Sequence, residues 1–355
     1  MQHIELNGTR ILVTGSAGFI GARFVERLLD DVVDAEIVGL DDLNDYYSPK
    51  LKEYRLARVE RVARRSRSSY AFARGSIADA SFLDSVFGRV GFDVVVNLAA
   101  QAGVRYGAEH PEVYVQSNLV GFVNLLEACR RVGTTRHLVY ASSSSVYGGG
   151  LTAPFKVGDP TDSPYSLYAA TKKSNELLAH AYGKLYDLPS TGLRFFTVYG
   201  PAGRPDMFYY SAAKALIVGA RVKLFNRGNC LRDFTYVDDV AEAIKRAAQN
   251  APERRKGDDG LPIPPCAVYN VGRGRPESAL ALLDLLQTEL ARVGAIPENQ
   301  DCEALRDYLP MQPGDVPTTC ADVEPFQRDF GFAPTVDLKD GLRKFAEWLK
   351  EYGVE

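Results

Sequence analysis

The fold is decided by Thr14-Gly15-Ser16-Ala17-Gly18-Phe19-Ile20-Gly21, a glycine-rich turn near the start of this 355-residue chain. A β-branched strand is predicted before it, over Arg10–Thr14, and a helix is predicted after it, as far as Leu29. A second strand, predicted over Ala35–Leu40, completes a βαβ unit of about 30 residues. The glycines let the backbone approach a pyrophosphate, and the start of the helix offers it free N–H groups. The turn therefore predicts a dinucleotide site.

An acid at the end of the second predicted strand indicates which dinucleotide binds. Asp41 follows the last glycine of the turn by about 20 residues, where a carboxylate accepts both hydroxyls of the adenosine ribose and repels a 2′-phosphate. We therefore expect NAD rather than NADP. The fourth predicted strand, Asp93–Leu98, is followed by Ala99-Ala100, and such small residues let a cofactor lie across the edge of the sheet.

The same alternation of strands and helices continues along the first 200 residues. Further strands are predicted near Tyr70–Gly75, His137–Ser142 and Ser190–Phe196, and further helices near Phe82–Phe87, Val113–Gly133 and Ser166–Tyr186. This pattern predicts an α/β fold with a Rossmann-type doubly wound parallel sheet. Prolines interrupt it after Gly200. We expect an NAD-binding domain over 1–200, with a return segment near 236–272, and a smaller, mostly helical substrate domain over 201–355.

Composition and residue usage exclude several classes of function. The net charge of −3 gives no general attraction to nucleic acid or membranes. No apolar run reaches the roughly 18 residues of a membrane span, and Met1–Thr9 lacks the layout of a signal peptide. The five cysteines are scattered and the four histidines form no metal motif, so we expect no metal site and a reduced, cytoplasmic protein. The basic run Arg55–Arg67 is expected to be a solvated helix face.

The chemistry is predicted by Tyr168 and Lys172, which lie one turn apart on one face of a predicted helix. A free tyrosine has a pKa near 10 and is a poor base at neutral pH. The charge of Lys172, together with that of a nicotinamide ring, stabilises the phenolate, and Lys172 can also bond the nicotinamide ribose. Such a tyrosine takes a proton from a sugar hydroxyl as hydride leaves the carbon.

These motifs carry a family resemblance. Together with the glycine turn and Asn97-Leu98-Ala99-Ala100, the stretches Ser142–Gly148, Tyr168–Lys172 and Arg232–Asp239 resemble extended short-chain dehydrogenases/reductases of the nucleotide-sugar epimerase group, over nearly the whole chain. Within that group the chain is most similar to UDP-glucuronate 4-epimerases. The stretches that carry this closer similarity are Leu43–Tyr47, Gln101–Tyr106, Phe195–Pro201, Gly203–Met207 and Met311–Val316.

The resemblance implies roles for further residues. Ser143 joins Tyr168 and Lys172 as a catalytic residue, and Ser142 lies near the nicotinamide. Arg105 faces the sugar, Arg232 binds the diphosphate, and Asp315 lies near the uridine ribose or the diphosphate. A homodimer is expected through the Tyr168 helix and the helix near Val113–Gly133. The expected cofactor site comprises Gly15, Gly18, Phe19, Ile20, Gly21, Asp41, Asn44, Ile77, Leu98, Ala99, Ala100, Asn118, Ser142, Tyr168 and Lys172.

The neighbours of Ser143 discriminate between reactions. Relatives that eliminate water or lose CO2 carry an acid one or two positions later, where this chain has Ser144 and Ser145. Oxidation of glucuronate at carbon 4 creates a β-keto acid, so an epimerase must hold the carboxylate out of the geometry that favours CO2 loss. Hydroxyls and a guanidinium suit this task, because a bidentate fork fixes the plane of a carboxylate. We expect Ser144, Ser145, Thr197 and Arg204 to contact the substrate, with Arg204 and Thr197 as the clamp.

The sequence thus predicts NAD-dependent 4-epimerisation of a UDP-sugar, with UDP-glucuronate as the preferred candidate and the NAD-bound enzyme as the working form. A UDP-glucose or UDP-N-acetylglucosamine 4-epimerase is the alternative, in which Arg204 caps a loop or binds phosphate. A non-catalytic NAD-sensing protein is the second alternative. The chain departs from the family pattern at Asp42, at Ser76 and at Ala202, where a bulkier, often aromatic residue is expected.

Overall fold

The computed structural model describes residues 1–88, 90–104, 106–257, 260–311 and 316–353. Its centre is a seven-stranded sheet in the order β14-β7-β6-β5-β2-β3-β4, and every pairing in it is parallel. The strand order reverses between β2 and β5, which is the arrangement of a doubly wound sheet. The expected fold class is confirmed. The strands are β2 (Arg10–Thr14), β3 (Glu36–Asp41), β4 (Ser69–Arg74), β5 (Val94–Asn97), β6 (His137–Ser143), β7 (Ser190–Phe195) and β14 (Cys266–Val271).

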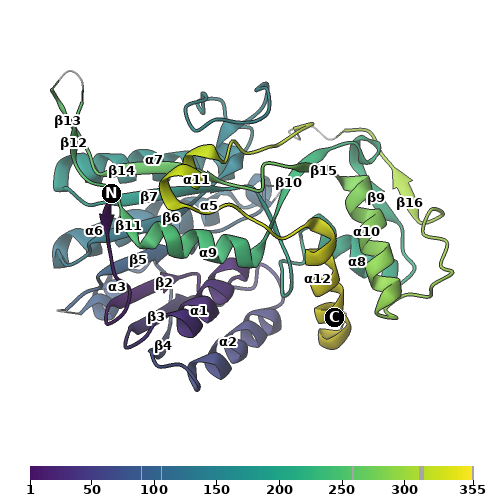
Figure 1. Cartoon of the computed structure of the whole chain (residues 1–355), viewed down its shortest axis with the longest axis horizontal. Helices are drawn as coiled ribbons and strands as arrows, with labels where there is room; N and C mark the ends of the chain where they lie inside the picture. Colours follow the sequence, from purple (N-terminus) through teal and green to yellow (C-terminus); the bar gives the residue numbers. More distant parts are fainter. Residues whose placement is uncertain (89, 105, 258–259, 312–315, 354–355) are drawn as a thin grey trace.

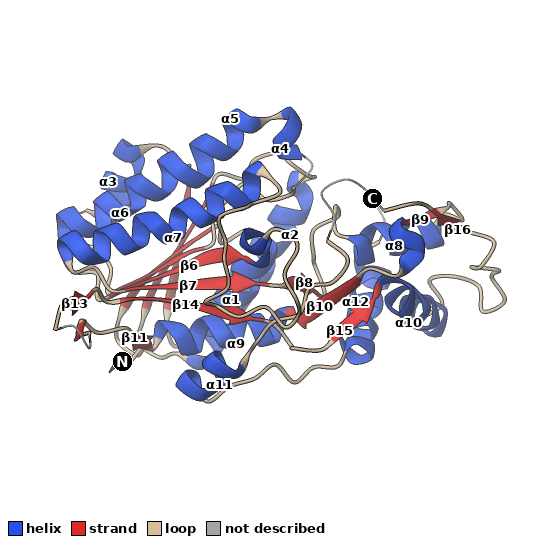
Figure 2. Ribbon diagram, turned by 90° about the horizontal axis from the view of Figure 1, so that it is seen from above, coloured by secondary structure: helices blue, strands red, loops and turns tan. Residues whose placement is uncertain are grey.

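Helices cover both faces of this sheet (Figures 1 and 2). One face carries α3 (Ala80–Phe87), α6 (Gly121–Val132) and α7 (Leu167–Tyr186), and the other carries α1 (Phe19–Asp31), α2 (Pro49–Ala63) and α9 (Val237–Ala248). Strand β2 shows why both faces are covered, since Ile11 and Val13 belong to one buried cluster and Leu12 to the other. A strand buried on both faces is apolar throughout, and this is why its sequence shows no alternation.

The C-terminal region lies beyond the carboxyl ends of the main strands (Figure 2). It contains a three-stranded sheet of β8 (Thr197–Tyr199), β10 (Leu231–Tyr236) and β15 (Pro276–Ser278), and a pair formed by β9 (Val222–Leu224) and β16 (Arg306–Tyr308). Its helices are α8 (Phe208–Ile217), α10 (Ala279–Arg292) and α12 (Leu338–Tyr352). Between these elements the chain returns to the main sheet, where β14 pairs with β7 and α11 (Glu324–Phe330) packs beside β14.

The remaining elements are short. They are β1 (Gln2–His3), which pairs with β11 (Asn250–Ala251), the pair of β12 (Arg255–Lys256) and β13 (Pro262–Ile263), α4 (Tyr106–Glu109), and the 3-10 segments η2 (Ser144–Tyr147) and η3 (Phe225–Gly228).

The single helix predicted near Val113–Gly133 is wrong in its first half. The structure has α5 (Pro111–Tyr114), a π-helical segment η1 (Val115–Val120) and only then α6. Asn118 in η1 explains the change, because its side chain bonds the backbone N–H and C=O of Gln101 at 2.8 and 3.0 Å. Its carbonyl accepts a hydrogen bond of 2.7 Å from Nδ2 of Asn175 on α7. A π-turn redirects backbone and side chain in this way, and such turns are frequent at functional sites.

The prediction of a solvated basic face is wrong for the first residue of the run. The side chain of Arg55 on α2 points inward and the residue is only 2% exposed. The later arginines Arg61, Arg64, Arg65 and Arg67 are exposed, as expected. Arg55 therefore has a different role from the other arginines of this run.

Candidate active site

A cleft of about 1030 Å³ opens where the carboxyl ends of the main strands face the C-terminal region. Open α/β sheets bind their ligands at this edge. The far wall comes from β9, the start of η3 and β10. Most of the predicted site residues line the cleft: Gly15, Gly18, Phe19, Ile20, Gly21, Asp41, Asn44, Ile77, Leu98, Ala99, Ala100, Ser142, Ser143, Ser144, Ser145, Tyr168, Lys172, Thr197, Arg204 and Arg232.

Three predicted site residues are not among them. Asn118 lies behind the cleft wall and holds the backbone of Gln101, as described above. Arg105 and Asp315 lie outside the described residues. The predicted residues also omitted lining side chains, among them Tyr46, Tyr47, Gln101, Tyr106 and Met207. All five fall in the stretches that carried the closer family resemblance, so the signal for them was present in the sequence.

The glycine turn leaves no room for side chains. A Cβ on Gly15, whose φ is +69°, would lie 2.6 Å from the backbone nitrogen of Ala99, and one on Gly21 would lie 2.0 Å from the carbonyl oxygen of Gly15. Helix α1 begins directly after Gly18, has no acid in its first turn, and its N-cap makes no side-chain hydrogen bond. A bare helix start beneath a side-chain-free turn fits the pyrophosphate of a dinucleotide.

Asp41 at the end of β3 lies beside this turn. One carboxylate oxygen accepts from the N–H of Ala17 at 3.1 Å and the other from the N–H of Leu43 at 2.9 Å. Burial raises the pKa of this carboxyl, while Lys52, with its Nζ 3.9 Å away, works in the opposite direction. The remaining lone pairs of the Asp41 carboxylate are suited to accept hydrogen bonds from ribose hydroxyls. A dianionic 2′-phosphate there would be repelled.

The Ser143, Tyr168 and Lys172 side chains come from two elements that end at the cleft. Ser143 closes β6, where its Oγ accepts from the N–H of Ser145 at 3.1 Å and caps η2. Ser166 caps α7 by accepting from the N–H of Ala169 at 3.1 Å, which places Tyr168 in the first turn. Lys172 follows one turn later, with its Nζ 5.9 Å from the centre of the Tyr168 ring.

The electrostatics of these groups are set by burial. Burial lowers the pKa of Lys172 to about 8, and its Nζ donates to the carbonyl of Ala141 at 2.8 Å. Burial also raises the pKa of Tyr168, against the opposing effects of the Arg204 guanidinium and a hydrogen bond with Ser143. The charge that opposes the effect of burial on the pKa of Tyr168 is therefore that of Arg204, whereas the sequence predicts Lys172 in this role.

A buried ion pair supports the floor of the site. Ser142 lines the cleft, but its hydroxyl donates to Glu176 at 2.6 Å. Both carboxylate oxygens of Glu176 accept from Arg194 on β7, each at 2.8 Å. Burial alone would raise the pKa of Glu176, but Arg194 lowers it. This network joins α7, β6 and β7 directly beneath Ser143.

Arg204 is held by an acid two residues away. Its Nε and Nη2 donate to the two oxygens of Asp206 at 3.0 and 2.9 Å, and the hydroxyl of Tyr46 donates to the same carboxylate at 3.2 Å. The Arg204 side chain is 24% exposed and lines the cleft. Its guanidinium is therefore oriented before any ligand binds.

Two further predicted substrate contacts, Thr197 and Arg232, lie on strands β8 and β10 of the C-terminal region. Thr197 begins β8 and pairs with Phe234 on β10. Arg232 on β10 donates to the carbonyls of Leu231 and Pro317 at 2.9 and 3.4 Å, so it has no acid partner among its described hydrogen bonds. The adjacent Asp233 is fully buried and accepts three backbone N–H bonds from Arg273, Gly274 and Ala321. Within the Arg232–Asp239 motif, Arg232 thus lines the cleft, and Asp233 holds together the loops that contain Arg273 and Ala321.

In the described part of the chain, no cluster of three or more His, Cys, Asp or Glu side chains is arranged to hold a metal ion. Among the same residues, no helix combines the length and apolarity that crossing a membrane requires.

Fold and cleft together define a dinucleotide-binding enzyme scaffold with a Ser, Tyr and Lys set at the sheet edge. Residues 11–272 match the NAD dependent epimerase/dehydratase family, and the chain belongs to that family. The predicted family membership is thereby confirmed.

The relatives and a solved structure narrow the comparison. The chain is 44% identical to Protein CapI of Staphylococcus aureus over 97% of this chain and 99% of that protein. It is 43% identical to UDP-glucuronate 4-epimerase 4 of Arabidopsis thaliana over 98% of this chain and 76% of that protein. The crystal structure of UDP-glucuronic acid 4-epimerase from Bacillus cereus, in complex with UDP-glucuronic acid and NAD, has a TM-score of 0.81 at 30% identity and covers 97% of this chain and 100% of its own.

Proposed function

We propose that this chain is an NAD-dependent UDP-sugar 4-epimerase whose substrate is UDP-glucuronate. The observation that carries the proposal is a single cleft holding two sets of groups. The first is the Ser143, Tyr168 and Lys172 set beside a dinucleotide turn, and the second is the oriented guanidinium of Arg204. The full-length similarity to UDP-glucuronate 4-epimerases supports it.

The proton chemistry falls to Tyr168 and Ser143. Tyr168 accepts the proton of the sugar 4-hydroxyl, and Ser143 bonds that oxygen and later the ketone oxygen. Lys172, charged and buried beside Tyr168, bonds the nicotinamide ribose and favours the phenolate. A bound NAD would supply the hydride acceptor for sugar carbon 4 and, once reduced, the hydride donor to the opposite face of the ketone.

The 4-ketone of glucuronate is a β-keto acid, so its carboxylate must be controlled. Loss of CO2 is fastest when the bond to the carboxylate lies parallel to the carbonyl π system. The edge of the Arg204 guanidinium that Asp206 leaves open, together with the Thr197 hydroxyl of the same cleft, fixes the plane of the carboxylate away from that geometry. Ser144 and Ser145 add hydroxyl donors where dehydrating or decarboxylating relatives carry an acid.

Incubation with UDP-glucuronate, without added NAD and followed by proton NMR, tests the function. We expect UDP-galacturonate with no loss of CO2. A UDP-pentose product would contradict the proposed role of the serines. No conversion of UDP-glucuronate but conversion of UDP-glucose would show that Arg204 serves another purpose, and no conversion of any UDP-sugar would favour the NAD-sensing alternative.

We also propose a homodimer formed through α7 and the neighbouring η1 and α6. Large apolar side chains are exposed on these helices: Val115 at 39%, Leu177 at 60% and Leu185 at 69%. Exposed apolar groups on adjacent helices favour a helical interface. A Leu177→Lys variant that sediments as a monomer beside a dimeric wild type would support this assembly, and a monomeric wild type would contradict it.

The domain division and the compartment are proposals of the same kind. The return of α9 and β14 to the main sheet supports a nucleotide-binding unit of 1–200 plus 236–272, with 201–355 supplying the substrate wall. All five cysteines are free thiols, which supports a reducing, cytoplasmic compartment. Limited proteolysis tests this division into domains. A cleavage that removes part of the main sheet but leaves the cofactor bound would contradict it.

A further inference from the structure

Arg55 on α2 is buried, and none of the acids that the structure describes bonds to it. The residue is 2% exposed, and all its described hydrogen bonds go to neutral acceptors. Its Nε donates to the carbonyl of Ala202 at 2.9 Å and its Nη2 to that of Gly203 at 3.0 Å. Its Nη1 donates to the carbonyl of Ala17 at 3.2 Å and to the Tyr47 hydroxyl at 2.6 Å. One side chain thus joins three segments that are far apart in the sequence.

Each of these segments contributes to the cleft. Ala17 belongs to the glycine turn, and its N–H binds the carboxylate of Asp41. Tyr47 lines the cleft directly. Gly203 immediately precedes Arg204, whose guanidinium is the proposed carboxylate clamp. The cofactor end and the substrate end of the cleft therefore share one buried cation.

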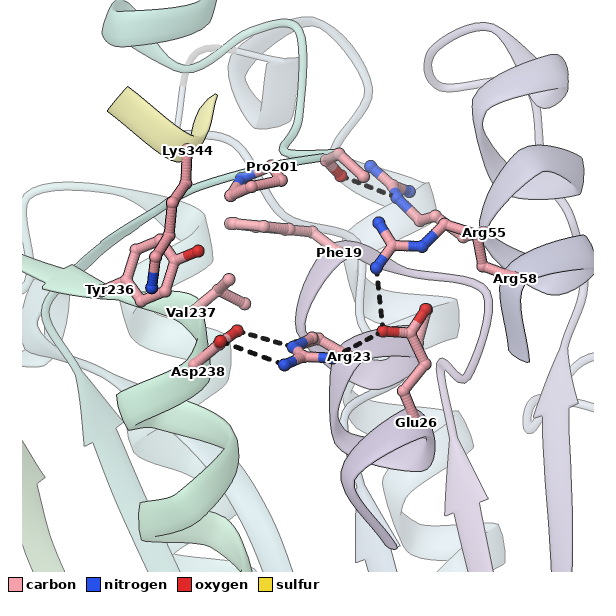
Figure 3. A pocket seen from close by; sticks show the side chains of 12 residues that line it. Phe19, Arg23, Glu26, Arg55, Arg58, Pro201, Tyr236, Val237, Asp238 and Lys344 are labelled. Atoms are coloured by element: carbon pink, nitrogen blue, oxygen red, sulfur yellow. Dashed lines mark hydrogen bonds and ion pairs between the residues drawn. The ribbon is translucent and has the colours of Figure 1, made fainter. Parts of the chain in front are cut away.

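Arg55 binds the carbonyls of the two residues that precede Arg204, Ala202 and Gly203, and both of these residues are buried. Ala202 has a left-handed φ of +54°, a conformation that is unfavourable for a residue with a Cβ, and the hydrogen bond from Arg55 to its carbonyl helps to hold it. A second pocket of about 250 Å³ lies beside it, lined by Phe19, Pro201 and Lys344 among others. Figure 3 shows Arg55 at the edge of this pocket. Ala202 itself is 4% exposed and belongs to the main buried cluster, so Arg55 adds directional hydrogen bonds to a segment that is already packed in the fold.

The adjacent tyrosines strengthen the link. Tyr47 accepts from Arg55, while Tyr46 donates to Asp206, the acid that orients Arg204. A planar guanidinium bonds several acceptors at fixed angles, whereas a lysine ammonium is a point charge that cannot span them. The geometry of the fork, and not only the charge, is what connects the segments.

We propose that Arg55 is a positioning residue that couples the dinucleotide-binding turn to the Arg204 segment, so that the clamp on the substrate carboxylate is fixed by the same side chain that fixes the cofactor turn. Arg55 acts through Arg204 and through Ala17 rather than on either ligand. This inference rests on the proposed function, in which Arg204 holds the carboxylate of UDP-glucuronate.

The test compares Arg55→Lys with Arg58→Lys in the full-length enzyme. Both substitutions keep the charge on α2, but Arg58 donates to Glu26 at 3.0 Å and bonds neither cleft segment. Two quantities are measured with UDP-glucuronate: the fraction of turnovers that end in CO2 loss, and the half-time of NAD release during dialysis. The CO2 fraction is a ratio of two fates of one ketone, so it does not depend on how much of the enzyme is folded.

We expect Arg55→Lys to give a CO2 fraction at least ten-fold above the detection limit that bounds the wild type, and to shorten NAD retention at least ten-fold, while Arg58→Lys matches the wild type. A wild-type CO2 fraction or wild-type NAD retention in Arg55→Lys would each overturn the coupling. A raised CO2 fraction in Arg55→Lys but not in Arg204→Gln would also overturn it, because the effect would bypass Arg204. If the wild type leaves UDP-glucuronate unchanged, the proposed function fails, and NAD retention alone then decides whether Arg55 fixes the turn.

Discussion

The buried pair of Glu176 and Arg194 gives the sharpest prediction for stability. Glu176 is 6% exposed and Arg194 is 3% exposed, and the two bonds between them are both 2.8 Å long. Glu176→Gln keeps the shape of the side chain but removes its charge, which leaves the guanidinium buried without a counter-ion. Removing one partner of a buried ion pair costs about 3–5 kcal/mol, a large part of the roughly 5–15 kcal/mol that stabilises a typical fold.

The same cost can be expressed as a melting temperature. An unfolding entropy of about 2 cal/mol/K per residue gives roughly 0.7 kcal/mol/K for a chain of this length, so the expected fall in Tm is about 4–7 °C. Urea denaturation followed by circular dichroism measures the free energy directly. Asp30→Asn is the matched control, because Asp30 forms an exposed pair with Arg65 and its loss should cost under about 1 kcal/mol.

A double-mutant cycle separates the pair from its surroundings. Arg194→Met should also destabilise the fold, since it leaves the buried Glu176 with only the partly exposed Lys173, 3.6 Å away, as a cationic partner. The double variant should cost much less than the sum of the two single variants, because neither charge then remains unpaired. Additive costs, or a Glu176→Gln protein within about 1 kcal/mol of the wild type, would refute the view that this pair is electrostatically isolated from solvent.

Three other outcomes are expected. Tyr168→Phe should lower the epimerisation rate by about 10²–10⁴-fold while NAD stays bound, measured by NMR and by cofactor analysis, and a rate near wild type would exclude Tyr168 as the base. His137 lies between the Ala248 carbonyl and the Thr191 hydroxyl, and burial lowers its pKa to about 4. As the pH falls, the unfolded chain therefore protonates at His137 before the folded protein does. Relative to His137→Gln, the wild type should lose about 3 kcal/mol of stability from pH 6.5 to 4, in urea titrations, and parallel curves would contradict this. Asp41→Asn should narrow the preference for NAD over NADP, measured by binding titration, whereas an unchanged preference would remove Asp41 from the ribose site.

The central fold could be predicted from sequence because its signals are local. Strand β2 begins and ends at the predicted residues, Arg10–Thr14, and α7 begins one residue after the predicted Ser166. Apolar runs, glycines and a capping serine are properties of neighbouring residues. The π-helical turn at Val115–Val120 could not be predicted in this way, since one extra residue barely changes the apolar period and the partners of Asn118 come from other elements.

The same distinction between local and long-range signals applies to the candidate site. Short motifs predicted that Gly15, Tyr168 and Lys172 belong to one site, because the glycine turn joins β2 to α1 and the tyrosine and lysine lie at the capped start of α7. What the motifs could not predict is how side chains pair over long separations. Arg55 was assigned to a solvated face because its neighbours in sequence are basic, but its acceptor on Ala202 is 147 residues away.

The charge around Tyr168 shows why these pairings matter for chemistry. Burial makes Tyr168 a weaker acid, and the opposing charge comes from Arg204 rather than from Lys172, whose own pKa burial lowers to about 8. Asp206 holds the Arg204 guanidinium and partly offsets its charge. In the proposed mechanism, a substrate carboxylate that shares Arg204 would further reduce the positive charge acting on Tyr168. The phenolate would then be stabilised mainly by Lys172 and by the charge of a bound nicotinamide, so the proposed base would be strongest when the cofactor site is filled.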